Sequence, residues 1–368
     1  MKKRFLGVLL SVAMVAAVLA GCGSSGAKET AAPAGSETEA ASEAASGETE
    51  AAGNTGDVIT VGFSQVGAES DWRTANSESM KSTFSTENGY NLIFDDAQQK
   101  QKNQIAAIRN FIQQEVDYIV LAPVTESGWD TVLQEAKDAE IPVIIVDRMV
   151  NVSDDSLYAA WVGSNFKLEG QKACEWLKQY AAAKNMSEVN IVDIQGTIGA
   201  SAQIGRTEAL NEAVEANGWN LLAQQTGEFT QAKGQEVMES MLKQYDNINV
   251  VYCENDNEAF GAIEAIKAAG KTVGPDGDIL VMSFDTTKQG ITDTLSGDII
   301  VNTECNPLHG PRVEQIIKQL QAGETPEKQA YVEEGIYAHG SDVASVSIDG
   351  TDYEVTEVTQ DVVDARAY

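Results

Sequence analysis

The chain has few of the residues that zinc, disulfide and imidazole chemistry require. Its 368 residues include two histidines and four cysteines. Three of the cysteines are far apart in the sequence and form no CxxC pattern: Cys174, Cys253 and Cys305. This spacing excludes a disulfide framework and favours buried free thiols over a zinc site. We therefore predict no metal and no cofactor.

Basic residues are also scarce. Lysine and arginine together number 25 against 56 aspartates and glutamates, which gives a formal net charge of -31. Nucleic-acid binding depends on a positive surface that releases counterions, so this balance argues against a nucleic-acid partner. The content of 43% hydrophobic and 22% charged residues is that of a globular protein, and the length suggests two domains of roughly 100 to 200 residues each.

The first 22 residues have the pattern of a secretory signal. Two lysines and an arginine precede an apolar run over residues 5–20, which is too short for a spanning helix. The run leads into Leu-Ala-Gly-Cys at residues 19–22, which resembles the lipobox of bacterial lipoproteins. That resemblance implies cleavage before Cys22, a diacylglyceryl thioether on its sulfur, and an extracytoplasmic protein anchored to the cell membrane. The alternative is an ordinary signal with a cysteine near the cut.

Residues 23–57 differ in composition from everything that follows. They are mainly Ala, Ser, Thr, Gly and Glu and include no aromatic residue. Such a stretch cannot bury enough apolar surface to fold, and its acids repel one another. We predict a disordered acidic tether, which lets the folded part that starts near Val58 move over the membrane surface.

Residues 142–148, PVIIVDR, organise the rest of the chain. Four consecutive β-branched residues lie between a proline and the pair Asp147-Arg148. This run predicts a strand buried on both faces. Ligands of open parallel sheets bind beyond the carboxyl ends of the strands, so we expect Asp147 and Arg148 at the edge of a polar cleft. A surface ion pair of small energetic value is the alternative.

Strand-like apolar runs alternate with amphipathic helical stretches from residue 58 onward, and the pattern restarts after residue 163. This alternation predicts an α/β protein with two similar doubly wound, Rossmann-like lobes. Polar residues follow several of the predicted strands: Asp95, Asp96, Asp147, Arg148, Glu254, Asn255, Asp256, Asp285 and Glu304. Of these, Asp95 and Asp96 are expected to cap the helix that comes next.

The last segment departs from the repeat. Residues 307–322 predict a helix with Gly310-Pro311 in its opening turn. Residues 344–355 predict a hairpin that turns at Asp349-Gly350, and the pattern leaves open whether residues 356–358 prolong its second strand.

Several stretches resemble the type I periplasmic sugar-binding proteins of ABC transporters, and in particular their galactofuranose-binding type. They are VGFSQVGAESDWR at 61–73, QQKQKNQIAAIRNF at 98–111, APVTESGWDTVLQEAKDAEIPV at 122–143, QGTIGASAQIGR at 195–206 and KGQEVMES at 233–240. The resemblance implies a three-segment hinge that crosses between the lobes near Ser164, Glu304 and Ala330. The N-terminal lobe would comprise residues 58–163 and 305–330, and the C-terminal lobe with its tail residues 164–304 and 331–368.

The resemblance also implies which residues hold a sugar between the lobes. They are Trp72, Arg73, Asp147, Arg148, Arg206, Phe229, Asn255, Asp285 and Glu304, with Glu69 as a further candidate. Sugar hydroxyls both donate and accept hydrogen bonds, so carboxylates, amides and arginines beside an aromatic face suit them. Other roles stay open for single residues, namely core packing for Trp72, and helix capping or hinge support for Asp285 and Glu304.

The implied function is capture of a monosaccharide, galactofuranose or a related sugar, for delivery to an ABC permease. The alternative is a receptor subunit that reports a different sugar or a polyol to a signalling system. An enzyme acting on glycosides is disfavoured, because two acids at a catalytic separation cannot be established from sequence and sugar-binding clefts are rich in acids anyway. A repressor of the same fold is disfavoured as well, because the chain starts with a signal and a tether rather than a basic helix-turn-helix.

Overall fold

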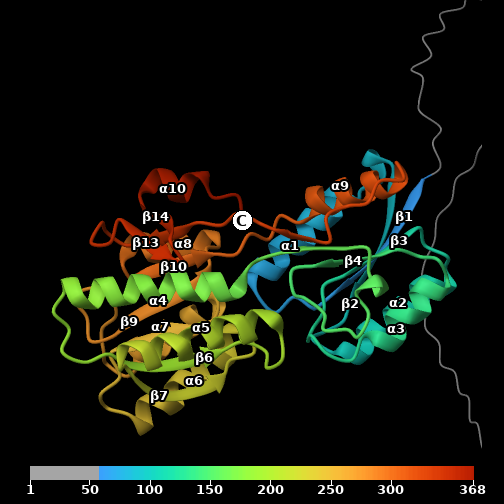
Figure 1. The fold of residues 1–368 in the computed structure, drawn as a ribbon. Helices are drawn as coiled ribbons and strands as arrows, with labels where there is room; N and C mark the ends of the chain where they lie inside the picture. Colours follow the sequence, from blue (N-terminus) through green and yellow to red (C-terminus); the bar gives the residue numbers. More distant parts are fainter. Residues whose placement is uncertain (1–57) are drawn as a thin grey trace, which may run out of the picture. The chain divides into compact units, whose positions relative to one another are not determined.

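The computed structural model describes residues 58–368, so the predicted signal, the lipobox Cys22 and the tether lie outside the described residues. Strands and helices alternate through the first half of this range (Figure 1). The elements there are β1 (Ile59–Gln65), α1 (Asp71–Thr83), η1 (Thr86–Asn88), β2 (Tyr90–Asp96), α2 (Gln101–Gln113), β3 (Tyr118–Leu121), α3 (Asp130–Asp138), β4 (Val143–Val146), η2 (Asp155–Leu157) and β5 (Ala160–Gly163).

The alternation then repeats. The second set comprises α4 (Phe166–Ala183), β6 (Asn190–Gln195), α5 (Ser201–Asn217), β7 (Asn220–Thr226), α6 (Gln231–Gln244), β8 (Val250–Cys253), α7 (Asp256–Ala268), β9 (Leu280–Asp285), α8 (Lys288–Ser296) and β10 (Val301–Glu304). It is followed by α9 (Gly310–Gln321), β11 (Gln329–Tyr331), β12 (Ile336–Ala338), β13 (Ser345–Ile348), β14 (Thr351–Glu357) and α10 (Gln360–Ala365).

The two sets of strands form two sheets with the same internal order. The N-terminal sheet runs β2-β1-β3-β4-β5-β11, and every pairing in it is parallel. The C-terminal sheet runs β7-β6-β8-β9-β10-β12-β14-β13, and its first five strands are parallel in the same order. The prediction of two similar doubly wound lobes is therefore confirmed.

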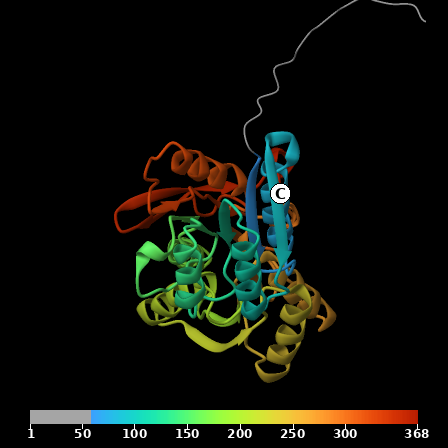
Figure 2. The same cartoon turned by 90° about the vertical axis from the view of Figure 1, so that its right-hand side faces the viewer.

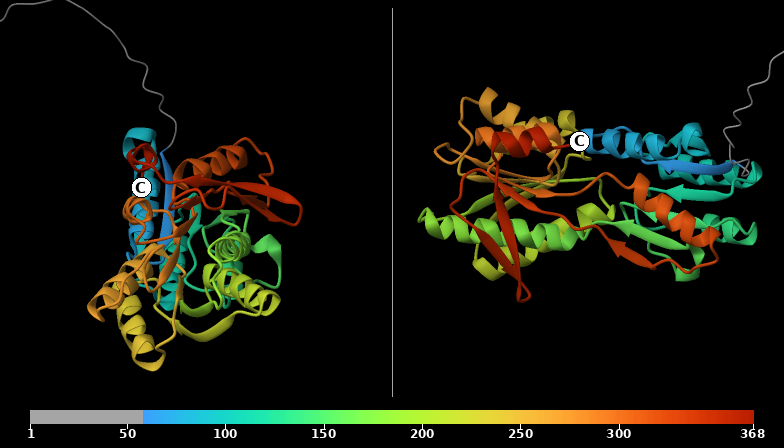
Figure 3. Two further views of the ribbon diagram at one scale, coloured as in Figure 1. Left: turned by 90° about the vertical axis from the view of Figure 1, so that its left-hand side faces the viewer. Right: turned by 90° about the horizontal axis from the view of Figure 1, so that it is seen from above.

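Each sheet is covered on both faces, as the run VIIV in β4 predicts. Ile144 and Val146 pack in a cluster with residues of α1 and α9, whereas Val143 and Ile145 pack on the opposite face with residues of α2 and α3. In the C-terminal sheet, residues of α4, β13 and β14 form the cluster on one face and residues of α6 and α7 the cluster on the other. The helices can be followed from further directions in Figures 2 and 3.

Three segments connect the sheets, and we call them the three crossings. Residues 164–165 lead from β5 to α4, residues 305–309 from β10 to α9, and residues 332–335 from β11 to β12. Because β11 pairs with β5 and β12 pairs with β10, the second and third crossings return the chain to the N-terminal sheet and back.

The prediction that Asp95 and Asp96 cap the next helix was wrong, whereas the helix and the hairpin predicted for the last segment are confirmed. Asp95 and Asp96 belong to β2, and Asp96 Oδ1 accepts from the backbone N–H of Gln98 at 2.8 Å rather than capping α2. That hydrogen bond lies in the turn between β2 and α2.

The last segment has the predicted helix and hairpin. The helix α9 has its proline at the opening turn. The hairpin turns at residues 349–350, both with positive φ, and β14 then continues to Glu357.

Candidate functional site

A buried polar cavity lies where the carboxyl ends of the strands of both sheets meet. Residues from both lobes line it: Glu69, Ser70, Trp72, Arg73, Asp147, Arg148, Phe166, Ala202, Arg206, Phe229, Asn255, Asp285 and Cys305. Charged side chains are rarely buried unless they are paired, so their concentration here marks a site built to bind something polar.

Asp147 stands at the end of β4 in a left-handed backbone conformation, with φ of 62°. The tight turn depends on Gly163 of the neighbouring β5, because a Cβ there would lie 2.3 Å from the carbonyl oxygen of Asp147. The indole N–H of Trp161 donates to the same oxygen at 3.1 Å. These contacts fix the backbone, and a strained conformation held in this way is typical of functional sites.

Arg73 is the main partner of the Asp147 carboxylate. It lies in the first turn of α1, which begins at the N-cap Ser70, and its Nη2 is 2.7 Å from Asp147 Oδ2. Its Nε donates to Glu69 Oε1 at 2.9 Å. Burial by itself lowers the pKa of Arg73, but the Asp147 and Glu69 carboxylates outweigh it and raise that pKa above its ordinary value. Arg73 therefore stays charged.

Arg148 follows Asp147 and contacts both lobes. Its Nη1 donates to the backbone carbonyl of Val124 at 3.1 Å, and its Nη2 lies 3.6 Å from Glu69. Its guanidinium carbon lies 5.0 Å from the centre of the Phe229 ring, which belongs to the C-terminal lobe. Burial, with repulsion from Arg73, lowers the pKa of Arg148 to about 10, so this side chain is also positive at neutral pH.

Trp72 supplies the apolar wall of the cavity. It is 3% exposed and packs in a cluster with Phe166, Ala202 and Phe229. Its indole N–H donates to the backbone carbonyl of Cys305, in the second crossing, at 2.6 Å. The second crossing thus holds the ring, and the guanidinium carbon of Arg73 lies 4.6 Å from the centre of the ring.

Arg206 is the counterpart of Arg73 in the C-terminal lobe. Its Nε donates to Glu169 Oε2 at 2.8 Å, and its Nη2 lies 3.5 Å from Asp285 Oδ1. Asp285 ends β9 with φ of 98°. Burial raises the pKa of Asp285 well above its ordinary value, although Arg206 opposes that effect. A protonated Asp285 could donate a hydrogen bond as well as accept one.

Asn255 and Phe229 hold each other in place. Asn255 is the N-cap of α7, where its side-chain oxygen accepts from the Glu258 N–H at 2.8 Å. Its amide nitrogen donates to the Phe229 carbonyl at 3.2 Å. Gly196 leaves room for the phenyl ring, because a Cβ there would lie 1.9 Å from Phe229. The glycine of the QGTIG loop therefore makes space for an aromatic ring.

Nine of the ten predicted ligand residues line this one cavity, which is a necessary condition for a shared ligand. The exception is Glu304, which lies outside the lining. Its Oε2 accepts from the Gly335 N–H at 2.9 Å, and its Oε1 accepts from Arg366 and from the Tyr368 hydroxyl at 2.7 Å each. The structure thus places Glu304 between the third crossing and the C-terminal residues Arg366 and Tyr368.

Four lining residues were not predicted: Ser70, Phe166, Ala202 and Cys305. Phe166 follows the first crossing and Cys305 begins the second, so a search for apolar residues at the predicted hinge could have found them. All three predicted thiols, at positions 174, 253 and 305, are buried and free of disulfides, as expected.

Some polar atoms in the lining are buried without a hydrogen-bond partner. Among residues 58–368 these include Nη1 of Arg73 and Oε2 of Glu69. Buried polar atoms in native proteins nearly always have partners, so this donor and this acceptor are groups that a hydroxylated ligand would satisfy.

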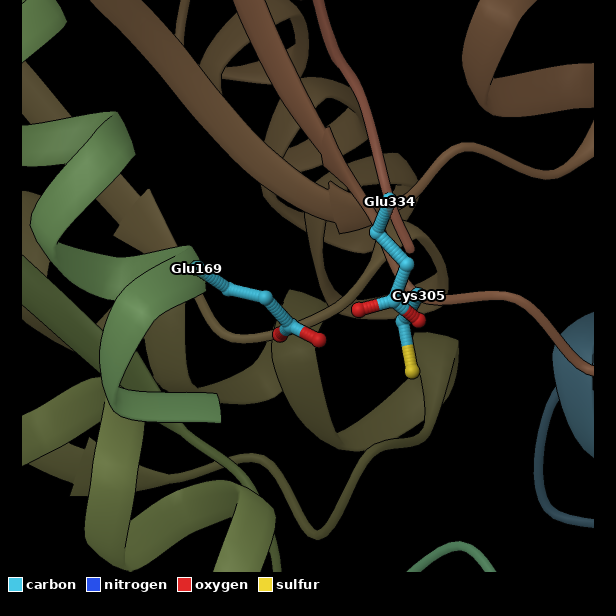
Figure 4. A group of neighbouring side chains, drawn as sticks. All are labelled: Glu169, Cys305 and Glu334. Carbon is cyan, nitrogen blue, oxygen red and sulfur yellow. The ribbon is translucent and has the colours of Figure 1, made fainter. Parts of the chain in front are cut away.

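One group of three side chains of metal-ligating types occurs among the described residues, and one of the three, Cys305, also lines the cavity. Carboxylate oxygens of Glu169 and Glu334 and the sulfur of Cys305 lie within 4.8 Å of one another (Figure 4). The cationic Arg206 already lies 2.8 Å from Glu169, and the Lys172 ammonium donates to the Glu334 carbonyl at 2.9 Å. Because these cations supply the positive charge, we assign the group no metal.

Within residues 58–368, no helix combines the length and the apolar character needed to cross a membrane. A family model described as a periplasmic binding protein domain matches residues 61–303. The galactofuranose-binding protein YtfQ of Escherichia coli K12 is 42% identical over 284 residues, which are 76% of this chain and 87% of that protein.

Two solved structures are similar over the same share of the chain. A Mycobacterium smegmatis protein in complex with β-D-fucofuranose has a TM-score of 0.73 and 43% identity, covering 76% of this chain and 91% of that one. The periplasmic binding component of the arabinose ABC transporter of Shewanella sp. ANA-3, bound to α- and β-L-arabinofuranose, has a TM-score of 0.71 and 41% identity, covering 76% and 92%. The chain belongs to the periplasmic binding protein family, with a type I fold like that of these sugar-binding members.

Proposed function

We propose that the cavity binds one monosaccharide in its furanose form, and that the protein delivers this sugar to an ABC permease. The observation that carries the proposal is that each lobe contributes one buried Asp–Arg pair to the cavity, beside Trp72. Arg73 with Asp147 and Arg206 with Asp285 present hydrogen-bond donors and acceptors from the two lobes to one cavity. Charge-assisted bonds of this kind suit a ligand whose every face carries hydroxyls.

The lining limits the ligand. Side chains of both lobes surround the cavity closely, which suits a single sugar ring rather than an oligosaccharide. The relatives whose names or structures specify furanoses share 41 to 43% identity with this chain, which supports the furanose form. The nine lining residues that resemble the family site would make the ligand contacts. We assign Glu304 to the support of the hinge.

Anchoring and transport complete the proposal. The Leu-Ala-Gly-Cys sequence at residues 19–22 supports a lipid anchor on Cys22. Lobes joined by crossings close by hinge motion around a ligand, and a permease would receive the closed form. The protein would therefore work outside the cytoplasm, held near the membrane by its lipid.

Titration calorimetry of the purified protein tests the ligand class. D-galactose, L-arabinose and D-fucose should bind, because each forms a furanose, whereas myo-inositol, which has no furanose form, should bind much more weakly. A site shaped for the hydroxyls of a furanose leaves buried polar groups unpaired when a six-membered carbocycle occupies it. Tight binding of myo-inositol with none of the three sugars bound would overturn the proposal.

A further inference from the structure

Glu334, in the third crossing, joins all three crossings through one oxygen. Its Oε1 accepts from the Ser164 hydroxyl at 2.6 Å and from the Asn306 backbone N–H at 2.7 Å. Ser164 belongs to the first crossing and Asn306 to the second. The Cys305 sulfur lies 3.3 Å from the Ser164 oxygen and can donate its own proton there. Both hydrogen bonds on Glu334 use Oε1, so Oε2 is available for another contact.

Glu169 links this junction to the ligand cavity. Its Oε2 takes two contacts from Arg206, at 2.8 Å from Nε and 2.8 Å from Nη2. Its Oε1 is buried and has no hydrogen-bond partner within the described part of the chain. Carboxylate oxygens of Glu169 and Glu334 lie within 4.8 Å of each other, as Figure 4 illustrates. One carboxyl therefore faces the cavity arginine and the other faces the hinge.

Two buried carboxylates at this separation repel each other strongly, and a single shared proton removes the repulsion. The charges around the pair are Arg206 of α5, Lys172 of α4, Glu304 of β10 and Asp285 of β9. Burial raises the pKa of Glu334 well above its ordinary value, and Glu169 adds to this effect. Burial also raises the pKa of Glu169, but Arg206 opposes it. The proton therefore belongs on Glu334.

We propose that Glu169 and Glu334 share one proton, held on Glu334, and that this arrangement keeps Glu169 ionised so that it positions Arg206 for the ligand. The pair thereby connects the three crossings to a cavity side chain. Both residues are positioning residues, since neither lines the cavity. The inference rests on the proposed sugar-binding function.

The two carboxyls should respond differently to the same substitution. Glu334→Gln preserves the shape of a protonated acid, with an oxygen for Ser164 and Asn306 and an N–H for Glu169, so D-galactose affinity should stay within about threefold of the parent. Glu334→Ala removes the junction and should weaken binding by about tenfold or more. Glu169→Gln removes the charge that faces Arg206 and should weaken binding on the order of a hundredfold.

The matched control is Glu208→Gln. Glu208 lies on α5, as Arg206 does, but its carboxylate pairs with Lys167 at the surface and is 52% exposed, so the substitution should leave binding unchanged. Calorimetry with D-galactose at pH 7 measures all four variants. The proposal is overturned if Glu334→Gln weakens binding as much as Glu169→Gln, or if Glu169→Gln behaves like the control.

Thermal unfolding without ligand separates this inference from the proposed function. Glu169→Gln should lower Tm by several degrees, because the buried Arg206 loses its charged partner, while Glu334→Gln should leave Tm almost unchanged. These Tm values decide the inference even if the parent protein binds no sugar, which would overturn the proposed function alone. A Tm well above the parent value in Glu334→Gln would mean that Glu334 is ionised in the native protein, and would contradict the inference.

Discussion

Asp147 and Asp285 occupy equivalent positions in the two lobes, each at the carboxyl end of the fourth strand of its sheet and each with a positive φ, 62° and 98°. Each also meets an arginine from the helix that follows the first strand of its lobe. Arg73 of α1 lies 2.7 Å from Asp147, and Arg206 of α5 lies 3.5 Å from Asp285. The duplicated fold therefore places the same Asp–Arg pair on both sides of the cavity.

Replacing Arg148 by alanine should weaken sugar binding by about 2 to 5 kcal/mol, because a buried charge that contacts Glu69 and Asp147 is removed and its partners are left unpaired. The matched control is Arg109→Ala, which removes an arginine from a surface pair with Glu135. Calorimetry that finds the two variants equal to the parent would show that Arg148 does not contact the ligand.

Replacing Glu304 by glutamine tests the predicted ligand residue that lies outside the cavity. The change removes the charge that faces Arg366, so the free energy of unfolding should fall by about 1 to 3 kcal/mol. Preference among pentoses and hexoses should stay the same. A change in that preference, measured by competition calorimetry, would restore the ligand contact that the resemblance implies.

His309 should make the protein less stable in mild acid. Burial lowers its pKa from 6.5 to about 4, so between these values the unfolded chain binds more protons than the folded one. Its stabilising effect is complete above pH 6.5 and should decline by up to about 3 kcal/mol as the pH falls to 4.

Denaturant unfolding at several pH values measures this effect. The variant His309→Gln should lose stability less steeply between pH 6.5 and 4 than the parent does. Equal slopes in the parent and in His309→Gln would mean that another group controls the acid response.

The Cys22→Ser variant should be released from membranes, because the sulfur that would carry the lipid is absent. Fractionation of cells that express the parent and the variant measures the distribution. A variant that stays in the membrane fraction would exclude the lipid anchor at Cys22.

The sequence predicts the parts of the site that follow directly from strand order. Asp147, Asn255 and Asp285 each come after a buried apolar run, and parallel strands bring such positions to one edge of a sheet. The family resemblance adds Trp72, in the first turn of α1, and Phe229, in the loop before α6, because neither follows from a periodic pattern. These predictions depend on local pattern, and the structure places all five residues in the cavity lining.

Contacts between distant segments could not be predicted in this way. Glu304 ends a strand as Asp285 does, but its partners Arg366 and Tyr368 follow it by 62 and 64 residues, and no local pattern reveals them. Glu169 and Glu334 are acids in polar stretches, where a surface position is the usual expectation. Their burial results from the packing of α4 against the crossings, which only the tertiary structure defines.

The ring form of the bound sugar tests the central claim most directly. Uniformly ¹³C-labelled D-galactose in solution is mainly pyranose, and its bound carbon resonances distinguish the two ring forms. Binding to the protein should enrich the furanose resonances, because the cavity is proposed to select that form. Bound pyranose resonances, or no bound resonances at a saturating protein concentration, would contradict the account.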